Sequence, residues 1–83
     1  MESTPFYPLS ESIKNNRPLI IFLRNNRKLI GYLRAYDRHM NLILENVKEI
    51  QSKETQNKNK NFYERYFSKL VLRGDSVVII LPF

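Results

Sequence analysis

Two short polar segments, Tyr36-Asp37-Arg38-His39-Met40-Asn41 and Leu72-Arg73-Gly74-Asp75-Ser76, each lie between two strand-like apolar runs. Between them they supply an imidazole, an amide, a carboxylate and a guanidinium, a set that can stack on and hydrogen-bond a nucleotide base. Bond-making chemistry is disfavoured, because Asp37 and His39 have no nucleophile, metal-ligand set or phosphate-binding glycine loop beside them. We therefore expect a binding protein rather than an enzyme, without a cofactor.

The composition favours a nucleic-acid partner. The chain has 83 residues and a formal net charge of +6, and residues 14–38 hold seven basic side chains against Asp37 alone. Such a field attracts polyanions. A chain this short fills one core, so we expect a single domain. We expect no small-molecule substrate. With no cysteine and one histidine, a disulfide framework and a metal site are disfavoured. No apolar run is long enough for a membrane span, and we expect an intracellular protein.

The remaining sequence predicts one helix followed by five strands. Residues 8–16 have a helical pattern, with Pro8 suited to the first position and Leu9 and Ile13 on one apolar stripe. Strand-like runs follow at 19–23, 28–36, 41–50, 62–72 and 77–81, and Asn25-Asn26 predicts a tight turn. Residues 51–61 contain no apolar side chain and predict a solvated loop. Sequential antiparallel strands favour a small, strongly curved sheet or barrel.

Three features of the strands predict details of the sheet. Gly31 within the second run indicates a sharp bend or a close backbone approach. In the third run we expect Leu42 and Leu44 to face inward, and Glu45 and Glu49 to face solvent. The run 77–81 is apolar on both faces, which an exposed edge strand should not be, so we expect another chain to cover it.

The two polar segments belong to longer motifs. Residues 29–45 (LIGYLRAYDRHMNLILE) resemble the first Sm motif, and residues 70–78 (LVLRGDSVV) resemble the second. The chain is thus similar to the Sm and Sm-like RNA-binding proteins, and stretches such as 44–49 (LENVKE) are most similar to a D-type member of the spliceosome core. The resemblance implies a mostly β fold, a short N-terminal helix followed by a five-stranded, strongly bent antiparallel sheet. It divides the chain into an N-terminal arm (1–7) and one Sm domain (8–83), with motif one at about 18–50, a variable loop at 51–61 and motif two at about 62–81.

The resemblance also implies an assembly and a function. The fourth strand of one subunit would pair with the fifth strand of the next in a seven-membered ring, with the first D-type and F-type Sm subunits as neighbours. The ring would hold the U-rich Sm site of a small nuclear RNA, supporting snRNP assembly and pre-mRNA splicing in the nucleus after assembly in the cytoplasm. The expected subunit interface comprises Tyr66, Phe67, Leu70, Val77, Val78, Ile79, Ile80 and Leu81.

Roles for individual residues follow from the same resemblance. His39 and Arg73 would stack on opposite faces of a uracil, Asn41 would read its edge, and Gly74 would leave room for the backbone to approach the base. Asp37 would orient Arg73 or the turn, and Asp75 is placed with it as an orienting residue. Four basic side chains are either solvated turn charges or phosphate contacts: Arg24, Arg27, Lys28 and Arg38.

Two alternatives remain open on the sequence. One keeps the fold but places the chain in a different Sm-like ring, acting in RNA decay or as an RNA chaperone. The other is a small basic barrel that binds an acidic protein partner, which explains the charge but gives His39, Asn41 and Arg73 no role.

Overall fold

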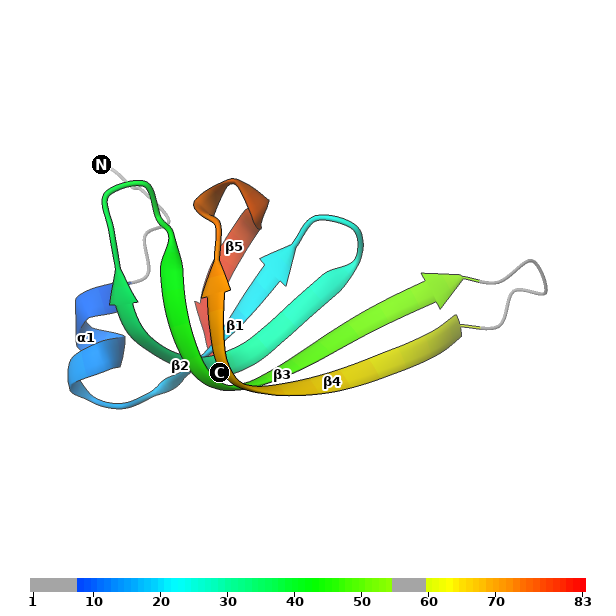
Figure 1. Cartoon of the computed structure of the whole chain (residues 1–83), viewed down its shortest axis with the longest axis horizontal. Helices are drawn as coiled ribbons and strands as arrows, with labels where there is room; N and C mark the ends of the chain where they lie inside the picture. Colours follow the sequence, from blue (N-terminus) through cyan, green and yellow to red (C-terminus); the bar gives the residue numbers. More distant parts are fainter. Residues whose placement is uncertain (1–7, 55–59) are drawn as a thin grey trace.

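The structure is a computed structural model, and it describes residues 8–54 and 60–83. It consists of a helix and one five-stranded antiparallel sheet, in the order β4-β3-β2-β1-β5 (Figure 1). The elements are α1 (Leu9–Lys14), β1 (Pro18–Leu23), β2 (Arg27–Tyr36), β3 (Leu42–Glu54), β4 (Lys60–Leu72), the 3-10 turn η1 (Gly74–Ser76) and β5 (Val77–Pro82). The predicted fold, a short helix followed by a strongly bent antiparallel sheet, is confirmed. The expected arm at 1–7 lies outside the described residues.

Helix α1 is shorter than predicted, and Pro8 lies one position before it. Pro8 is the N-cap, and its carbonyl accepts hydrogen bonds from the N–H groups of Glu11 and Ser12 at 3.2 and 3.3 Å. After Lys14, Asn16 adopts a φ of 52°, the left-handed geometry that ends helices. Leu9 is buried and Ile13 packs against the core, so the predicted apolar stripe docks the helix on the sheet.

The core lies on one face of the bent sheet, under α1. It is formed by apolar side chains that alternate along each strand with more exposed ones. The buried members are Leu9, Leu19, Ile21, Leu23, Leu29, Leu33, Leu42, Leu44, Val47 and Leu72. The inward placement predicted for Leu42 and Leu44 is confirmed. The order of strands leaves β4 and β5 as the two edges of the sheet.

The bend in the sheet is centred on Gly31 and the facing part of β3. A Cβ atom on Gly31 would lie 3.0 Å from Val47 Cγ2 and 3.3 Å from the carbonyl oxygen of Glu45, so the predicted close approach is confirmed. Opposite Gly31 the register shifts, and Asn46 takes a φ of 51°. This extra residue in β3 is a β-bulge, which increases local twist and bends the strand.

The predicted solvated loop at 51–61 is wrong at both ends. Strand β3 continues to Glu54 and β4 begins at Lys60, so the two strands form a long hairpin that projects from the rest of the sheet (Figure 1). Gln51 pairs with Tyr63 and Ser52 with Phe62 in an unbroken ladder. Backbone hydrogen bonds hold this ladder together, and they need no apolar side chains. The polar composition of residues 51–61 therefore gave no indication that the strands continue there.

The expectation that Glu49 faces solvent is also wrong. Its side chain is 4% exposed and lies between two arginines from neighbouring strands. Arg27 Nε donates to Glu49 Oε2 at 3.0 Å, and Arg65 Nε donates to Oε1 at 2.9 Å. These charge-assisted bonds satisfy both carboxylate oxygens, so burial is possible. Glu45, by contrast, is half-buried and pairs with Arg34.

We expect Glu49→Gln to lower the free energy of unfolding by about 1–3 kcal/mol, the usual worth of hydrogen bonds to a charged group. The amide nitrogen would face an arginine N–H, donor against donor. Glu45→Gln, the matched control at a more exposed ion pair, should cost less. Denaturant unfolding of both variants checks this, and equal losses would contradict the role of burial.

Candidate functional site

Three turns lie in a row on one side of the sheet (Figure 1). They are the β1–β2 turn at 24–26, the β2–β3 turn at 37–41 and η1. The N–H of Arg24 donates to the carbonyl of Ser76 at 3.3 Å, and the N–H of Gly74 donates to Asn41 Oδ1 at 2.9 Å. The 3-10 turn η1, which lies between the other two turns, is thus hydrogen-bonded to both of them, and the two polar segments meet in space.

Asp37 organises the β2–β3 turn. Its carboxylate accepts hydrogen bonds from the N–H groups of His39 at 2.8 Å and Asn41 at 3.0 Å, and from Asn41 Nδ2 at 3.0 Å. The N–H and side chain of Asn41, followed by His39, hold the pKa of Asp37 below its ordinary value of 3.8. The carboxylate is therefore ionised at neutral pH. It orients the turn, whereas Arg73 pairs with Asp75 at 3.0 Å.

The side-chain amide of Asn41 has one possible orientation. Oδ1 accepts from Gly74, and Nδ2 donates to the Asp37 carboxylate, which accepts only. One N–H hydrogen and one carbonyl lone pair remain on this amide. A fixed donor beside a fixed acceptor matches the hydrogen-bonding edge of a nucleobase.

Gly74 allows the two turns to touch. A Cβ atom at this position would lie 2.1 Å from the carbonyl oxygen of His39 and 2.9 Å from the carbonyl carbon of Met40. The space beside Gly74 is thus filled by the backbone of the first turn. This is a different reason for glycine from the room for a base that the resemblance implied.

A groove of about 550 Å³ opens beside this junction. Its polar rim includes Asp37, Asn41 and Arg73, and its apolar lining comes mainly from β2, β3 and β4. The groove is lined by Ala35, Tyr36, Asp37, Asn41, Leu42, Ile43, Val71, Leu72 and Arg73. The side chain of Arg73 is 80% exposed and reaches into solvent. His39 is exposed on the neighbouring turn and is not among the lining residues; Arg38 Nε donates to its Nε2 at 3.4 Å.

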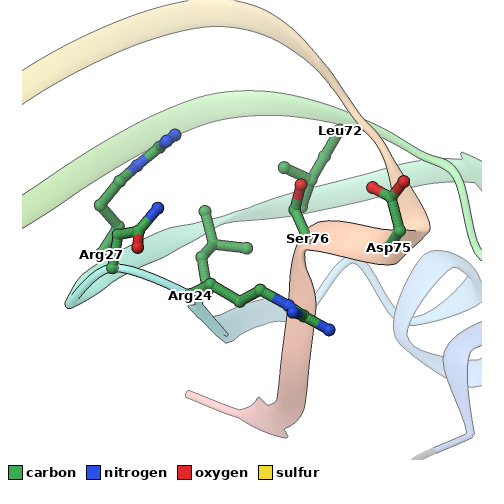
Figure 2. A pocket seen from close by; sticks show the side chains of 7 residues that line it. Arg24, Arg27, Leu72, Asp75 and Ser76 are labelled. Carbon is green, nitrogen blue, oxygen red and sulfur yellow. The ribbon is translucent and has the colours of Figure 1, made fainter.

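The other basic side chains that were candidates for phosphate contacts lie on different parts of the surface. Arg24 and Arg27 line a second groove together with Asp75 and Ser76 of η1 (Figure 2). Lys28 follows Arg27 in the strand and so points to the opposite face, where its Nζ lies 6.0 Å from the centre of the Phe22 ring. Glu49 and Arg65, which hold Arg27 in place, were not predicted from the sequence.

The expected interface residues lie on the two edge strands. The side chains of Tyr66 and Val78 are 71% and 64% exposed, and Ile79 and Leu81 are each 40% exposed. Four others are partly buried and pack against the core: Phe67, Leu70, Val77 and Ile80. Large apolar side chains on an unpaired edge mark a surface for strand pairing with another chain.

Within residues 8–54 and 60–83, no cluster of three histidine, cysteine or acidic side chains is arranged to hold a metal ion. The same part of the chain contains no helix that is both long and apolar enough to cross a membrane.

Comparisons with known sequences agree on one family. A family model described as LSM domain matches residues 11–82. Small nuclear ribonucleoprotein Sm D2 of Saccharomyces cerevisiae is 47% identical over 77 residues, which cover 93% of this chain and 69% of that protein. Probable small nuclear ribonucleoprotein Sm D2 of Dictyostelium discoideum is 46% identical over 83 residues, covering 93% of this chain and 74% of that protein.

Solved structures of Sm proteins are also similar to this chain. A heptameric archaeal Sm protein superposes with a TM-score of 0.65 at 32% identity, covering 90% of this chain and 94% of that chain. The Sm protein of Pyrococcus abyssii in complex with a uridine heptamer superposes with a TM-score of 0.71 at 26% identity, covering 94% of this chain and 100% of that chain.

We expect Gly74→Ala to separate the two turns, because its Cβ overlaps the His39 carbonyl. Overpacking against rigid backbone should cost about 1–3 kcal/mol. Thermal unfolding measures the loss, and the NMR signals of the Asn41 side-chain amide report whether its bond to Gly74 is broken. Ser76→Ala, in the same turn, is the control and should leave both unchanged; wild-type behaviour of Gly74→Ala would refute the contact.

Proposed function

The chain belongs to the LSM-domain family of Sm and Sm-like proteins, and we propose that it is a core subunit of a heteroheptameric Sm ring. This ring binds the U-rich Sm site of spliceosomal small nuclear RNAs and supports snRNP assembly and pre-mRNA splicing. The identity to Sm D2 proteins, 40–47% over most of the chain, supports this place among the seven subunits. The subunit acts in the nucleus, and the ring assembles in the cytoplasm.

The ring is supported by the two unpaired edges of the sheet. Because β4 and β5 are different edges of one sheet, pairing β4 of one subunit with β5 of the next leaves a new free edge each time. Such head-to-tail contacts close into a ring when the rotation between subunits allows it. The solved archaeal relative is a heptamer. In the proposed ring, the two subunits next to this one are the first D-type and the F-type Sm subunits.

The observation that carries RNA binding is the fixed amide of Asn41 between Asp37 and Gly74. Its free N–H donates to a uracil carbonyl oxygen, and its free lone pair accepts the ring N–H. Arg73 and His39, exposed on the two joined turns, stack on the faces of the base. The structural relative in complex with a uridine heptamer supports uridine as the bound base.

The surrounding charges have supporting roles. Asp37 holds the base-reading turn, and Asp75 restrains the otherwise exposed guanidinium of Arg73. Gly74 presents its backbone at the junction, and Arg38 adds positive charge beside His39. The protein is non-catalytic: its groups hold and stack rather than transfer protons or form bonds.

We expect Arg73→Ala to weaken RNA retention by the assembled ring while the ring still forms. Loss of one stacking partner should cost roughly 1–3 kcal/mol. Arg17→Ala removes an exposed arginine before β1, at the opposite end of that strand from the turns, and serves as the control. Filter binding of U-rich RNA to rings reconstituted with the six other subunits checks this. Equal affinities for the two variants would remove Arg73 from the site.

A charged side chain on β5 tests whether this edge of the sheet pairs with another subunit. We expect Ile79→Lys to block ring formation, because an ammonium buried at a strand interface without a partner costs several kcal/mol. Ser10→Lys adds the same charge on the exposed side of α1 and should assemble normally. Native mass spectrometry of the co-expressed subunits counts complete rings; a normal yield from Ile79→Lys would refute pairing through β5.

A further inference from the structure

A third groove, of about 300 Å³, lies where the β1–β2 turn meets the long β3–β4 hairpin (Figure 1). The N–H of Ser52 donates to the carbonyl oxygen of Asn26 at 3.3 Å, which holds the turn against the hairpin. The groove is lined by Phe22, Leu23, Asn26, Arg27, Lys28, Ile50, Ser52 and Phe62. None of these residues lines the groove beside Asn41, so the two grooves are separate.

Most of the lining side chains belong to the outward face of the sheet, opposite to the core. Phe22 pairs with Lys28 and Lys28 pairs with Ile50 across three adjacent strands, and paired residues share a face. Phe62 pairs with Ser52 further out along the hairpin and is 65% exposed. Two aromatic rings and an isoleucine thus form an apolar surface that no element of the described chain covers, and such a surface marks an interaction site.

Lys28 places a positive charge at this apolar surface. Its Nζ lies 6.0 Å from the centre of the Phe22 ring. Within residues 8–54 and 60–83, its ammonium has no carboxylate partner. A cation beside apolar surface is only partly hydrated, which strengthens its attraction for a carboxylate.

The acidic side chains near the groove are already paired. Glu49 is shared by Arg27 and Arg65, and Glu64 pairs with Lys48 at 3.5 Å. These two carboxylates face three cations before Lys28 is counted, so the surroundings of the groove keep a net positive charge. The partner that complements them is acidic.

Assembly of a ring leaves this groove open. Strand pairing extends a sheet at its edges, whereas the groove lies on a face of the sheet. Strand β4 has 13 residues and β5 has 6, so a neighbouring β5 of the same length pairs with about half of β4. The expected interface residues of β4 begin at Tyr66, and Phe62 lies outside them, in the part of β4 that belongs to the projecting hairpin.

We propose that this groove docks an acidic segment of a partner protein. A large apolar side chain of the segment packs on Phe22, Ile50 and Phe62, and a flanking carboxylate pairs with Lys28. An apolar anchor in a pocket, with charges at its rim, is the usual arrangement of the residues that dominate protein–protein affinity. RNA is the weaker fit, because one unpaired ammonium offers a single phosphate contact on an apolar surface. The proposal uses the ring described above only as the form of the protein to be tested.

The probe is a random peptide library displayed on phage, selected on the complete ring reconstituted with its six other subunits. A parallel selection uses a ring with Phe62→Ala, which alters an exposed side chain. Peptides enriched only on the wild-type ring should carry acidic residues around one large apolar residue. Phe83→Ala is the control, because Phe83 is 69% exposed and its N–H donates to Pro18, at the end of β1 away from the groove. It should enrich the same peptides as the wild type.

Fluorescence anisotropy with the enriched peptides then measures each contact. Phe62→Ala should weaken binding about tenfold or more, the effect of removing a dominant interface residue. The wild-type ring should prefer a peptide with glutamates to the same peptide with glutamines, and less so as salt is added. Lys28→Glu should abolish this preference. Lys14→Glu, the same change at an exposed position of α1, should keep it.

Four results would overturn the proposal while the ring's RNA function stands. Two come from the selection: no peptide that depends on Phe62, or Phe62-dependent peptides without acidic residues. Loss of affinity for U-rich RNA in Lys28→Glu but not in Lys14→Glu would assign the groove to RNA. Paired rings in native mass spectrometry that separate in Phe62→Ala would assign it to a second ring.

Discussion

The hydrogen bond from the N–H of Gly74 to Asn41 Oδ1 joins two turns that are 33 residues apart in the sequence. It forms only because Gly74 lacks a Cβ, so that its backbone can reach the carbonyls of His39 and Met40. The same contact fixes the Asn41 amide and sets where β5 leaves η1. Base reading, the course of the last strand and the groove between the turns thus depend on one backbone contact.

Much of the fold could be predicted from the sequence, because the strands and turns carry local signals. Asn25 and Asn26 both have positive φ, at 67° and 61°, as the turn pair predicted, and both strand edges carry the apolar residues expected of them. The bulge at Asn46 had no such signal. Alternation from Leu42 and Leu44 places Glu49 outward, but one extra residue reverses the faces, so that Val47 and Glu49 point inward. The partner strands then supply the arginines that make burial of Glu49 possible.

The site was predictable in its residue types but not in its pairings. The resemblance to the Sm motifs implied that Asn41, Arg73 and Gly74 lie together with His39. The first three meet at the junction with Asp37, whereas His39 is not among the residues that line the groove. That Arg73 pairs with Asp75 depends on side-chain geometry within η1, which spacing does not specify. The arginines also divide into two groups by their surroundings. Those at 27, 34 and 65 have carboxylate partners within the sheet, whereas Arg24 points from a turn and has no carboxylate partner within residues 8–54 and 60–83. The first group stiffens the sheet, and the second leaves charge available at the surface.

The curvature of the sheet has a consequence for the number of subunits in an assembly. The bend at Gly31 and Asn46 contributes to the angle between the two free edges of one molecule, β4 and β5. When copies or relatives join edge to edge, that angle becomes the rotation from each subunit to the next. A flatter sheet would turn less at every joint and would lead toward a wider circle or an open helix. The size of the circle, and with it the width of its central opening, therefore depends on features inside each subunit as well as on the joint, and a missing Cβ and one extra residue are two of them.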